Sequence, residues 1–161
     1  MKNLISNLFG TAEAVVGEAG PREAGALARL HAASFRRGWS DGEVEHLLLD
    51  RQVIAHSAKA GRDIEGFILS RMAAGEAEIL SVAVGRRRRG RGLARRLLDI
   101  HLRRLAGLGI QAVFLEVEEG NIPALRLYDR AGFREIGRRE GYYPRDDGVS
   151  IAALVLRRDL A

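Results

Sequence analysis

The sequence contains no cysteine, which excludes disulfide bonds, thiolate zinc sites and a cysteine nucleophile. No apolar run approaches the ~20 residues of a membrane-spanning helix, and the N-terminal apolar stretch is too short and too polar for a signal peptide. Histidines are few and too scattered for a metal-ligand motif: His31, His46, His56 and His101. These absences predict a cytoplasmic protein with no membrane segment and no metal site.

Lysine is also scarce: of the 26 basic residues only Lys2 and Lys59 are lysines, and the others are arginines. The formal net charge is +5, and the planar guanidinium group suits phosphate. This charge predicts an anionic partner without choosing among a nucleic acid, a phosphorylated cofactor and an acidic peptide. The 161 residues, 47% hydrophobic and 29% charged, are typical of one soluble globular domain spanning 1–161.

Hydrophobic periodicity and turn residues predict a mixture of helices and strands. Helices are expected over 21–35, after Ser40, where Ser40 and Glu43 form a capping box, from Leu93 to about Gly107, and over 121–132, which Asn121 and Pro123 open. Strands are expected over 52–58, 64–72, 77–84 and 111–117, followed by an antiparallel pair over 133–141 and 149–156. Residues 77–117 therefore form a strand-helix-strand unit with parallel strands, and the fold class is α/β or α+β with a mixed sheet.

The turn before the helix at Leu93 reads Arg89-Gly90-Arg91-Gly92-Leu93-Ala94. Backbone N–H groups at a helix start lack intrahelical acceptors and carry partial positive charge, so a glycine-rich turn there suits phosphate. Two common phosphate loops do not fit this turn. A P-loop would need lysine and then serine or threonine at Arg91 and Gly92, and a dinucleotide loop would need glycine at Arg95.

The turn does resemble the pyrophosphate-binding motif R/Q-x-x-G-x-G/A of the Gcn5-related N-acetyltransferase (GNAT) superfamily. Arg89, Gly92 and Ala94 match that motif. A register starting at Arg87 matches as well. The register from Arg89 is preferred because it begins the leucine-periodic helix at Leu93.

A second GNAT signature, N-x-x-A-x-x-L-Y-x-x-x-G-F, is matched at every fixed position over residues 121–133. Two flanking segments narrow the resemblance further: Phe114-Leu115-Glu116-Val117 before it and Gly141-Tyr142-Tyr143-Pro144 after it. Both are similar to the bacterial enzymes that acetylate the N-terminal alanine of a ribosomal protein. The resemblance extends from about Ile79 to Pro144.

The resemblance implies the GNAT fold, a mixed and mostly antiparallel sheet whose central parallel strands splay apart to admit acetyl-coenzyme A. The strand residues Val82, Ala83 and Val84 are then expected to offer backbone groups to the pantetheine arm. The turn is expected to hold the pyrophosphate through its amides, and an asparagine is expected to hydrogen-bond to the cofactor. These further cofactor-binding residues are Gly90, Arg91, Gly92, Leu93, Ala94, Arg95 and Asn121.

Two residues carry the catalytic roles that the resemblance implies. An N-terminal α-amine has a pKa of about 8 and must lose a proton before it can attack a thioester. Glu116 is the implied general base, and the alternative is a solvent-facing strand carboxylate. Tyr128 is the implied acid that protonates the leaving thiolate. Its alternative role is that of a helix aromatic packed beside Leu125, with the hydroxyl bonded to backbone.

The implied acceptor is a protein N-terminus, and the finer expectation is the N-terminal alanine of a small-subunit ribosomal protein. Glu118 stands where the closest relatives carry arginine, so another N-terminus, a lysine side chain and a small-molecule amine stay open as acceptors. Tyr142 and Tyr143 are expected to shape the peptide cleft. Acidic groups that would attract a basic peptide are Glu116, Glu118, Glu119, Asp146 and Asp147.

A protein of another class, a basic nucleic-acid-binding module, is suggested by the arginine run at 86–91. No Phe, Tyr or Trp lies between Phe67 and Phe114, so none of these side chains is near the arginines in sequence to stack on bases. A non-catalytic coenzyme A-binding protein is a third alternative, and the presence of both Glu116 and Tyr128 argues against it. The sequence therefore favours an acetyl-coenzyme A-dependent enzyme.

Overall fold

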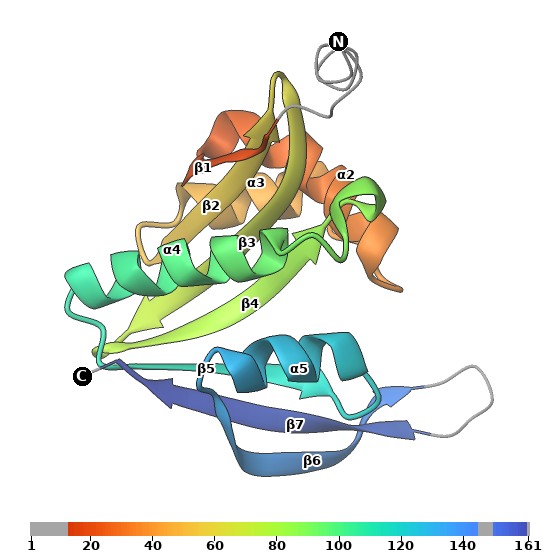
Figure 1. Ribbon diagram of the computed structural model, residues 1–161, viewed down its shortest axis with the longest axis vertical. Coiled ribbons are helices and arrows are strands. Elements are labelled where there is room, and N and C mark those ends of the chain that lie inside the picture. The colour runs from red at the N-terminus through yellow and green to blue at the C-terminus, as the bar shows by residue number, and fades with distance from the viewer. Residues whose placement is uncertain (1–12, 145–149, 161) are drawn as a thin grey trace, which may run out of the picture.

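The computed structural model describes residues 13–144 and 150–160, which form a seven-stranded sheet flanked by helices (Figure 1). The strand order is β1-β2-β3-β4-β5-β7-β6, and all described neighbours are antiparallel except β4 and β5. The predicted mixed sheet with one central parallel pair is confirmed. The strands are β1 (Val15–Glu18), β2 (Val53–Ala60), β3 (Asp63–Ala73), β4 (Glu76–Val84), β5 (Ala112–Glu118), β6 (Arg134–Pro144) and β7 (Ser150–Asp159).

Helices cover both faces of this sheet (Figure 1). The described α-helices are α2 (Ala24–Ser34), α3 (Asp41–Leu49), α4 (Leu93–Gly107) and α5 (Ile122–Arg130), with the short 3₁₀ helices η1 (Pro21–Glu23) and η2 (Arg86–Arg88). Helices α4 and α5 lie on one face, and α2 and α3 lie on the other. Within the described residues, no helix is long and apolar enough to cross a membrane.

Each face of the sheet has its own hydrophobic cluster, because side chains alternate along a strand. Ile68 packs in the cluster under α4 and α5, together with Leu97 and Leu105. Its neighbours on β3, Phe67 and Leu69, pack in the other cluster with α2 and α3. Burial on both faces explains why residues 67–69 form an uninterrupted apolar run.

The N-terminal region differs from the sequence-based prediction at two places. Residues 15–18 form β1, an unpredicted edge strand whose four residues include no buried one, so no hydrophobic alternation marks it. Helix α2 ends at Ser34, and Phe35 is its C-cap rather than a residue of its inner face. Phe35 is 41% exposed, although its ring stacks on His31.

The start of α3 confirms the predicted capping box. Ser40 Oγ accepts a hydrogen bond from the Glu43 amide at 3.1 Å, and Glu43 Oε2 accepts one from the Ser40 amide at 3.1 Å. The two side chains thus satisfy two backbone donors that the first helical turn would otherwise leave unpaired.

The two parallel strands pair only at one end and then diverge (Figure 1). Register pairs join residues 76–78 of β4 to residues 112–114 of β5, and none follows. Leu80 has no partner in β3, because Ser81 pairs with Leu69 and Ile79 with Ser70. This one-residue bulge bends β4 immediately after its last contact with β5 and explains the divergence.

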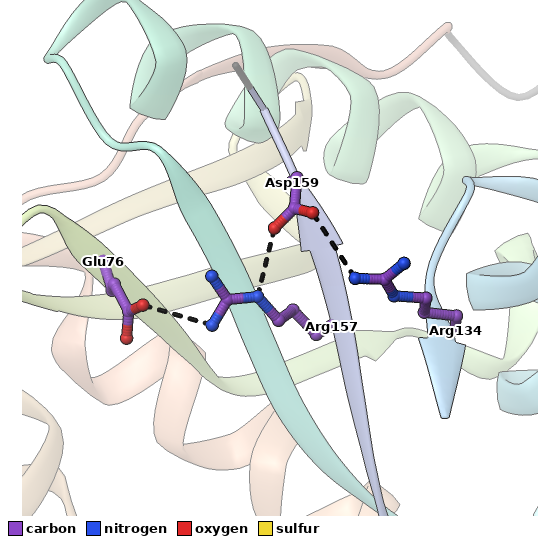
Figure 2. A network of polar contacts seen from close by, with 4 residues as sticks. All are labelled: Glu76, Arg134, Arg157 and Asp159. Carbon is purple, nitrogen blue, oxygen red and sulfur yellow. Dashed lines mark hydrogen bonds and ion pairs between the residues drawn. The ribbon is translucent and has the colours of Figure 1, made fainter. Parts of the chain in front are cut away.

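Arginines and carboxylates join the strands at the end where β4 and β5 are still paired (Figure 2). Arg157 on β7 reaches across β5 to Glu76 on β4, with Nη1 and Oε1 3.1 Å apart, and its Nε lies 3.0 Å from Asp159 Oδ1. Arg134 on β6 contacts the other oxygen of Asp159 at 3.5 Å. Three strands, β4, β6 and β7, are linked in this way at the end where β4 and β5 are still paired.

Candidate active site

The turn between β4 and α4 exposes backbone amides at the helix start. Gly90 and Gly92 have φ values of +75° and +81°, and Gly92 directly precedes the first residue of α4. A Cβ atom at either glycine would meet nothing within 4 Å. The amides of Leu93, Ala94 and Arg95 belong to the first helical turn, where no intrahelical acceptor exists. An open turn with unsatisfied amides is the arrangement that binds a phosphate.

Arg89, the first residue of the motif, braces this turn. Its Nε donates to the Val84 carbonyl at 3.0 Å, and its Nη2 lies 3.5 Å from Ser34 Oγ at the end of α2. Two arginine side chains after the turn are also used within the fold: Arg95 pairs with Asp99 at 2.9 Å, and Arg96 donates to the Ala14 carbonyl at 2.9 Å. The predicted contribution of Arg95 to phosphate binding therefore rests on its backbone amide.

Beyond Glu78, β4 has an unpaired edge toward β5. The Gly85 amide donates to the Glu65 carbonyl at 2.7 Å, so Gly85 and, two residues before it, Ala83 direct their backbone groups toward β3. Val82 and Val84 then direct theirs toward β5. Because the Val84 carbonyl already accepts from Arg89, Val82 offers both a donor and an acceptor along this edge.

Glu116 lies on β5, and its side chain is 20% exposed. Phe114 is the register partner of Glu78, so Glu116 lies on the same face of the sheet as Leu80, the face that α2 and α3 cover. Its Oε1 is 3.2 Å from Nη1 of Arg139 on β6. The sequence analysis missed Arg139, because β7 inserts between β5 and β6 and no motif marks this contact.

Tyr128 on α5 lies on the opposite face of the sheet from Glu116, within the cluster under α4 and α5. Its side chain is 7% exposed, and its ring meets Phe133 edge to face at a centroid distance of 5.5 Å. Burial raises the pKa of Tyr128 to about 12, so the phenol is protonated at neutral pH. Among the described residues, no hydrogen-bond partner is found for its hydroxyl.

Asn121 lies at the start of α5, where the sequence predicts a helix to begin, and its side chain caps that helix. Its Oδ1 accepts a hydrogen bond from the Ala124 amide at 3.3 Å and caps the N-terminus of α5. Its amide nitrogen is then the group left to donate to a cofactor, and the same residue positions α5 and therefore Tyr128.

A hollow of about 700 Å³ lies on the α3 side of the sheet, beside the bulge of β4. It is on the same face as Glu116, and its wall is ordered by Trp39, whose ring stacks on His31 and whose amide donates to His31 Nδ1 at 3.0 Å. Sequence patterns gave no sign of it, because its residues come from three separate elements and a loop. They are Arg37, Trp39, Gly42, Glu43, His46, Leu47, Arg71 and Leu80.

Some residues predicted near the acceptor cannot be placed. Tyr142 and Tyr143 belong to β6 by their backbone, but their side chains lie outside the described residues, as do Asp146 and Asp147. Glu119 and Glu118 are described: Glu119 forms a bidentate ion pair with Arg138, which lowers the pKa of Glu119 mainly through the hydrogen bond.

Comparison with known proteins identifies a family. The model of the acetyltransferase (GNAT) family matches residues 25–133. The chain is 33% identical over 94 residues to the [ribosomal protein bS18]-alanine N-acetyltransferase of Haemophilus ducreyi, a match covering 58% of this chain and 65% of that protein. It is 31% identical over 128 residues to the mycothiol acetyltransferase of Mycobacteroides abscessus, covering 71% of this chain and 43% of that protein. The matched region thus spans less than two-thirds of either relative.

Solved structures share the fold. The ribosomal-protein-S18-alanine N-acetyltransferase of Escherichia coli superposes with a TM-score of 0.85 at 22% identity, covering 92% of this chain and 94% of that chain. Arabidopsis thaliana NAA60 in complex with acetyl-CoA superposes with a TM-score of 0.81 at 18% identity, covering 91% and 98%. At these identities the likeness establishes the architecture.

Proposed function

This chain belongs to the acetyltransferase (GNAT) family, and from that premise we propose that it transfers the acetyl group of acetyl-coenzyme A to the N-terminal amine of a protein. The observation that carries the proposal is the parting of β4 and β5 directly beside the exposed amides at the start of α4. A strand edge without a partner and a phosphate-binding turn in continuous sequence suit a ligand whose long extended arm is joined to a pyrophosphate.

In this proposal the backbone from Gly90 to Arg95 holds the pyrophosphate, and Val82 and Val84 pair with the pantetheine arm as a neighbouring strand would. Ala83 contributes by pairing with β3 and keeping β4 in place. Asn121 donates from its amide nitrogen while its Oδ1 caps α5. The acetyl-coenzyme A would supply the thioester, and these residues orient it between the diverging strands.

Glu116 takes the proton of the acceptor ammonium, directly or through water, so that the neutral nitrogen attacks the thioester carbon. The carbon–sulfur bond then breaks, its electron pair leaves with the sulfur, and the second proton of the attacking nitrogen passes through solvent to the thiolate, which gives the amide and the free thiol. With a pKa of about 12, Tyr128 is a weaker acid than a thiol at about 8.5, so complete proton transfer to the thiolate is uphill. Tyr128 therefore acts as a hydrogen-bond donor to the departing sulfur.

Glu116 and Tyr128 act from opposite faces of the sheet. Glu116 shares its face with the hollow beside Leu80, whereas Tyr128 shares its face with the start of α4. An amine held in that hollow would approach the thioester from the side of Glu116, and the sulfur would lie on the side of Tyr128. Glu43 lines the hollow but already lies 3.8 Å from Arg37, which lines it too, so an acceptor ammonium would compete with that guanidinium for the carboxylate.

The acceptor that we propose is the N-terminal alanine of a small-subunit ribosomal protein, in the cytoplasm. Its support is the identity to enzymes named for that substrate, 33% in Haemophilus ducreyi. The similarity to mycothiol acetyltransferase supports a second candidate, a small-molecule amine. Both acceptors need the same thioester and the same general base, so they differ only in what occupies the hollow.

The experiment is intact-mass measurement after incubation with acetyl-coenzyme A. Three acceptors are compared: a basic peptide with N-terminal alanine, the same peptide with a blocked N-terminus and one internal lysine, and a small diamine. We expect a gain of one acetyl group on the first peptide alone, and a much slower gain with Glu116→Gln. The Glu135→Gln variant, at an exposed position of β6 outside the predicted site, serves as the matched control.

Acetylation of the blocked peptide or of the diamine alone would overturn the N-terminal assignment and leave acetyl transfer intact. If no acceptor gains mass and coenzyme A does not bind, acetyl transfer itself is wrong. Equal rates for Glu116→Gln and the wild-type protein would remove Glu116 from the mechanism.

A further inference from the structure

A second hollow, of about 480 Å³, lies on the α2 side of the fold, next to the loop that leaves β4. It is formed by α2, the turn between β2 and β3, the start of β3, and the loop that begins at Gly85. Its charged lining residues are Arg29, Arg62, Asp63, Glu65, Arg86 and Arg87. Four guanidinium groups against two carboxylates give it a net positive charge.

These four arginines differ from eight others in the protein, which pair with carboxylates. Eight arginines of the described chain form ion pairs within 4.0 Å, including Arg95 with Asp99 and Arg104 with Glu18. Within that same part of the chain, none of the four arginines at the hollow has such a pair, although Asp63 and Glu65 lie in its wall. Within the described chain the fold therefore gathers four guanidinium groups from separate segments, and the two carboxylates in the wall form no ion pair with them within 4.0 Å.

The base of the hollow is held in place by backbone hydrogen bonds. The Gly85 amide donates to the Glu65 carbonyl at 2.7 Å, and the Arg88 amide donates to the Gly85 carbonyl at 2.9 Å. Gly85 is also tightly enclosed, since a Cβ atom there would lie 3.3 Å from the Glu65 carbonyl oxygen. Arg86 and Arg87 thus project from a fixed short helix, and a ligand would meet them without first ordering the loop.

We propose that this hollow is a second phosphoryl-binding site, distinct from the amides at the start of α4. Guanidinium groups bind phosphoryl oxygens in pairs of charge-assisted hydrogen bonds, and an unpaired cluster of them has the required charge and donors. The phosphoryl group has two possible sources. One is the 3′-phosphate of coenzyme A, reached around the end of β4, an assignment that rests on the proposed function; the other is a separate phosphate-bearing molecule.

The test compares coenzyme A with 3′-dephospho-coenzyme A by titration calorimetry, and then titrates inorganic pyrophosphate into protein saturated with coenzyme A. The variant is Arg29→Gln with Arg62→Gln, which leaves the residues of the α4 turn untouched. The matched control, Arg51→Gln with Arg103→Gln, removes the same charge from two exposed positions elsewhere. Thermal melting verifies that both double variants fold.

We expect one of two results to support the site. If the hollow binds the cofactor's 3′-phosphate, the Kd of coenzyme A is about tenfold higher or more in the variant, and the Kd of 3′-dephospho-coenzyme A is unchanged. If it takes a separate ligand, pyrophosphate binds the saturated wild-type and control proteins and binds the variant about tenfold more weakly or worse.

The proposal is overturned if the variant changes neither affinity, or if the control loses as much as the variant, since the effect would then be one of overall charge. A wild-type protein that binds no coenzyme A would contradict the proposed function instead. In that case pyrophosphate titrated into the unliganded wild-type, variant and control proteins still decides whether the hollow binds phosphoryl groups.

Discussion

Tyr128 is a single residue with two separable properties, ring packing and a hydroxyl. The ring packs against Phe133 and the cluster under α4, and burial raises the pKa of the hydroxyl to about 12. Tyr128→Phe keeps the ring and removes the hydroxyl. We expect kcat to fall about 10²- to 10³-fold, the usual effect of losing one hydrogen bond to a developing negative charge. Steady-state kinetics would measure this loss.

The KM for acetyl-coenzyme A and the melting temperature provide the control for this substitution, because neither depends on a hydrogen bond to the leaving sulfur. Both should stay near their wild-type values. A kcat unchanged in Tyr128→Phe would show that the hydroxyl does not act on the leaving group, and that Tyr128 serves the fold alone.

His101 forms the centre of a buried polar cluster that the proposed mechanism does not use. Its Nδ1 is 2.7 Å from Nδ1 of His56, and its Nε2 is 2.7 Å from Ser70 Oγ. The residues come from α4, β2 and β3, and His101 and Ser70 are fully buried. Burial, followed by the nearby His56, lowers the pKa of His101 to about 3.

A lowered histidine pKa makes folding sensitive to acid. The unfolded chain binds a proton near pH 6.5, whereas folded His101 stays neutral down to about pH 3, so the stabilising contribution is complete above pH 6.5. As the pH falls through this window, each such histidine lowers the free energy of unfolding by up to about 1.4 kcal/mol per pH unit. The pKa of His56 is lowered as well, mainly by burial, so its contribution has the same sign.

Urea denaturation between pH 7 and pH 4 measures this dependence. His101→Gln keeps a polar side chain for His56 and Ser70 but cannot titrate, so we expect a shallower loss of stability with acid. His46→Gln, at an exposed position of α3, is the control and should retain the wild-type slope. Parallel curves for wild type and His101→Gln would contradict the assignment.

Among the elements, the start of α4 depends most on backbone conformation. Gly92 has a φ of +81°, which side-chain-bearing residues rarely adopt, although a Cβ atom there would meet nothing within 4 Å. The cost of Gly92→Ala therefore comes from strain in the backbone conformation and not from a steric clash. We expect a loss of about 1–2 kcal/mol in stability, or a turn that relaxes and no longer presents its amides.

Either outcome, lower stability or a relaxed turn, weakens binding of the pyrophosphate, so the Kd of coenzyme A should rise in Gly92→Ala. Gly107→Ala tests the same substitution at the other end of α4, where φ is not positive and the Cβ position is also open. That control should bind coenzyme A normally. Unaltered cofactor affinity in Gly92→Ala would refute the proposed role of the turn.

The whole molecule is divided by the divergence of β4 from β5. On one side lie β1 to β4, and on the other β5 to β7; within the described chain the two parts share three register pairs between β4 and β5. Arg157 reinforces this narrow connection from β7, because it pairs with Glu76 across β5 (Figure 2). The ion-pair network thus holds β4 and β5 together at the end opposite to the proposed site.

Removing this connection should affect ligand binding more than stability, since exposed ion pairs contribute little to folding. In Arg157→Gln, β4 and β5 can separate at the end where they are normally paired. The fraction of molecules whose strands diverge in the way that binds the cofactor then falls. If that fraction halves, the Kd of coenzyme A rises about twofold. Calorimetry measures it, with Arg104→Gln, which breaks the exposed pair with Glu18, as the control. Equal affinities in all three proteins would contradict this role.

Local patterns in the sequence were enough to predict several helices and to reveal the two GNAT signatures. Leucine spacing predicted α4, the capping box predicted α3, and Asn121 with Pro123 predicted the start of α5; all three are confirmed. Each depends on residues within a few positions of one another, whose conformations are governed by local hydrogen bonds and by the face that a helix or strand buries.

Contacts between residues far apart in the sequence became visible only in the folded chain. The pair of Glu116 with Arg139, the cluster of His56 with His101, and the four arginines of the second hollow join segments that no sequence spacing relates. The bulge at Leu80 and the insertion of β7 between β5 and β6 belong to the same class. These contacts follow from how the elements pack against a shared sheet, which depends on the whole chain and not on local sequence.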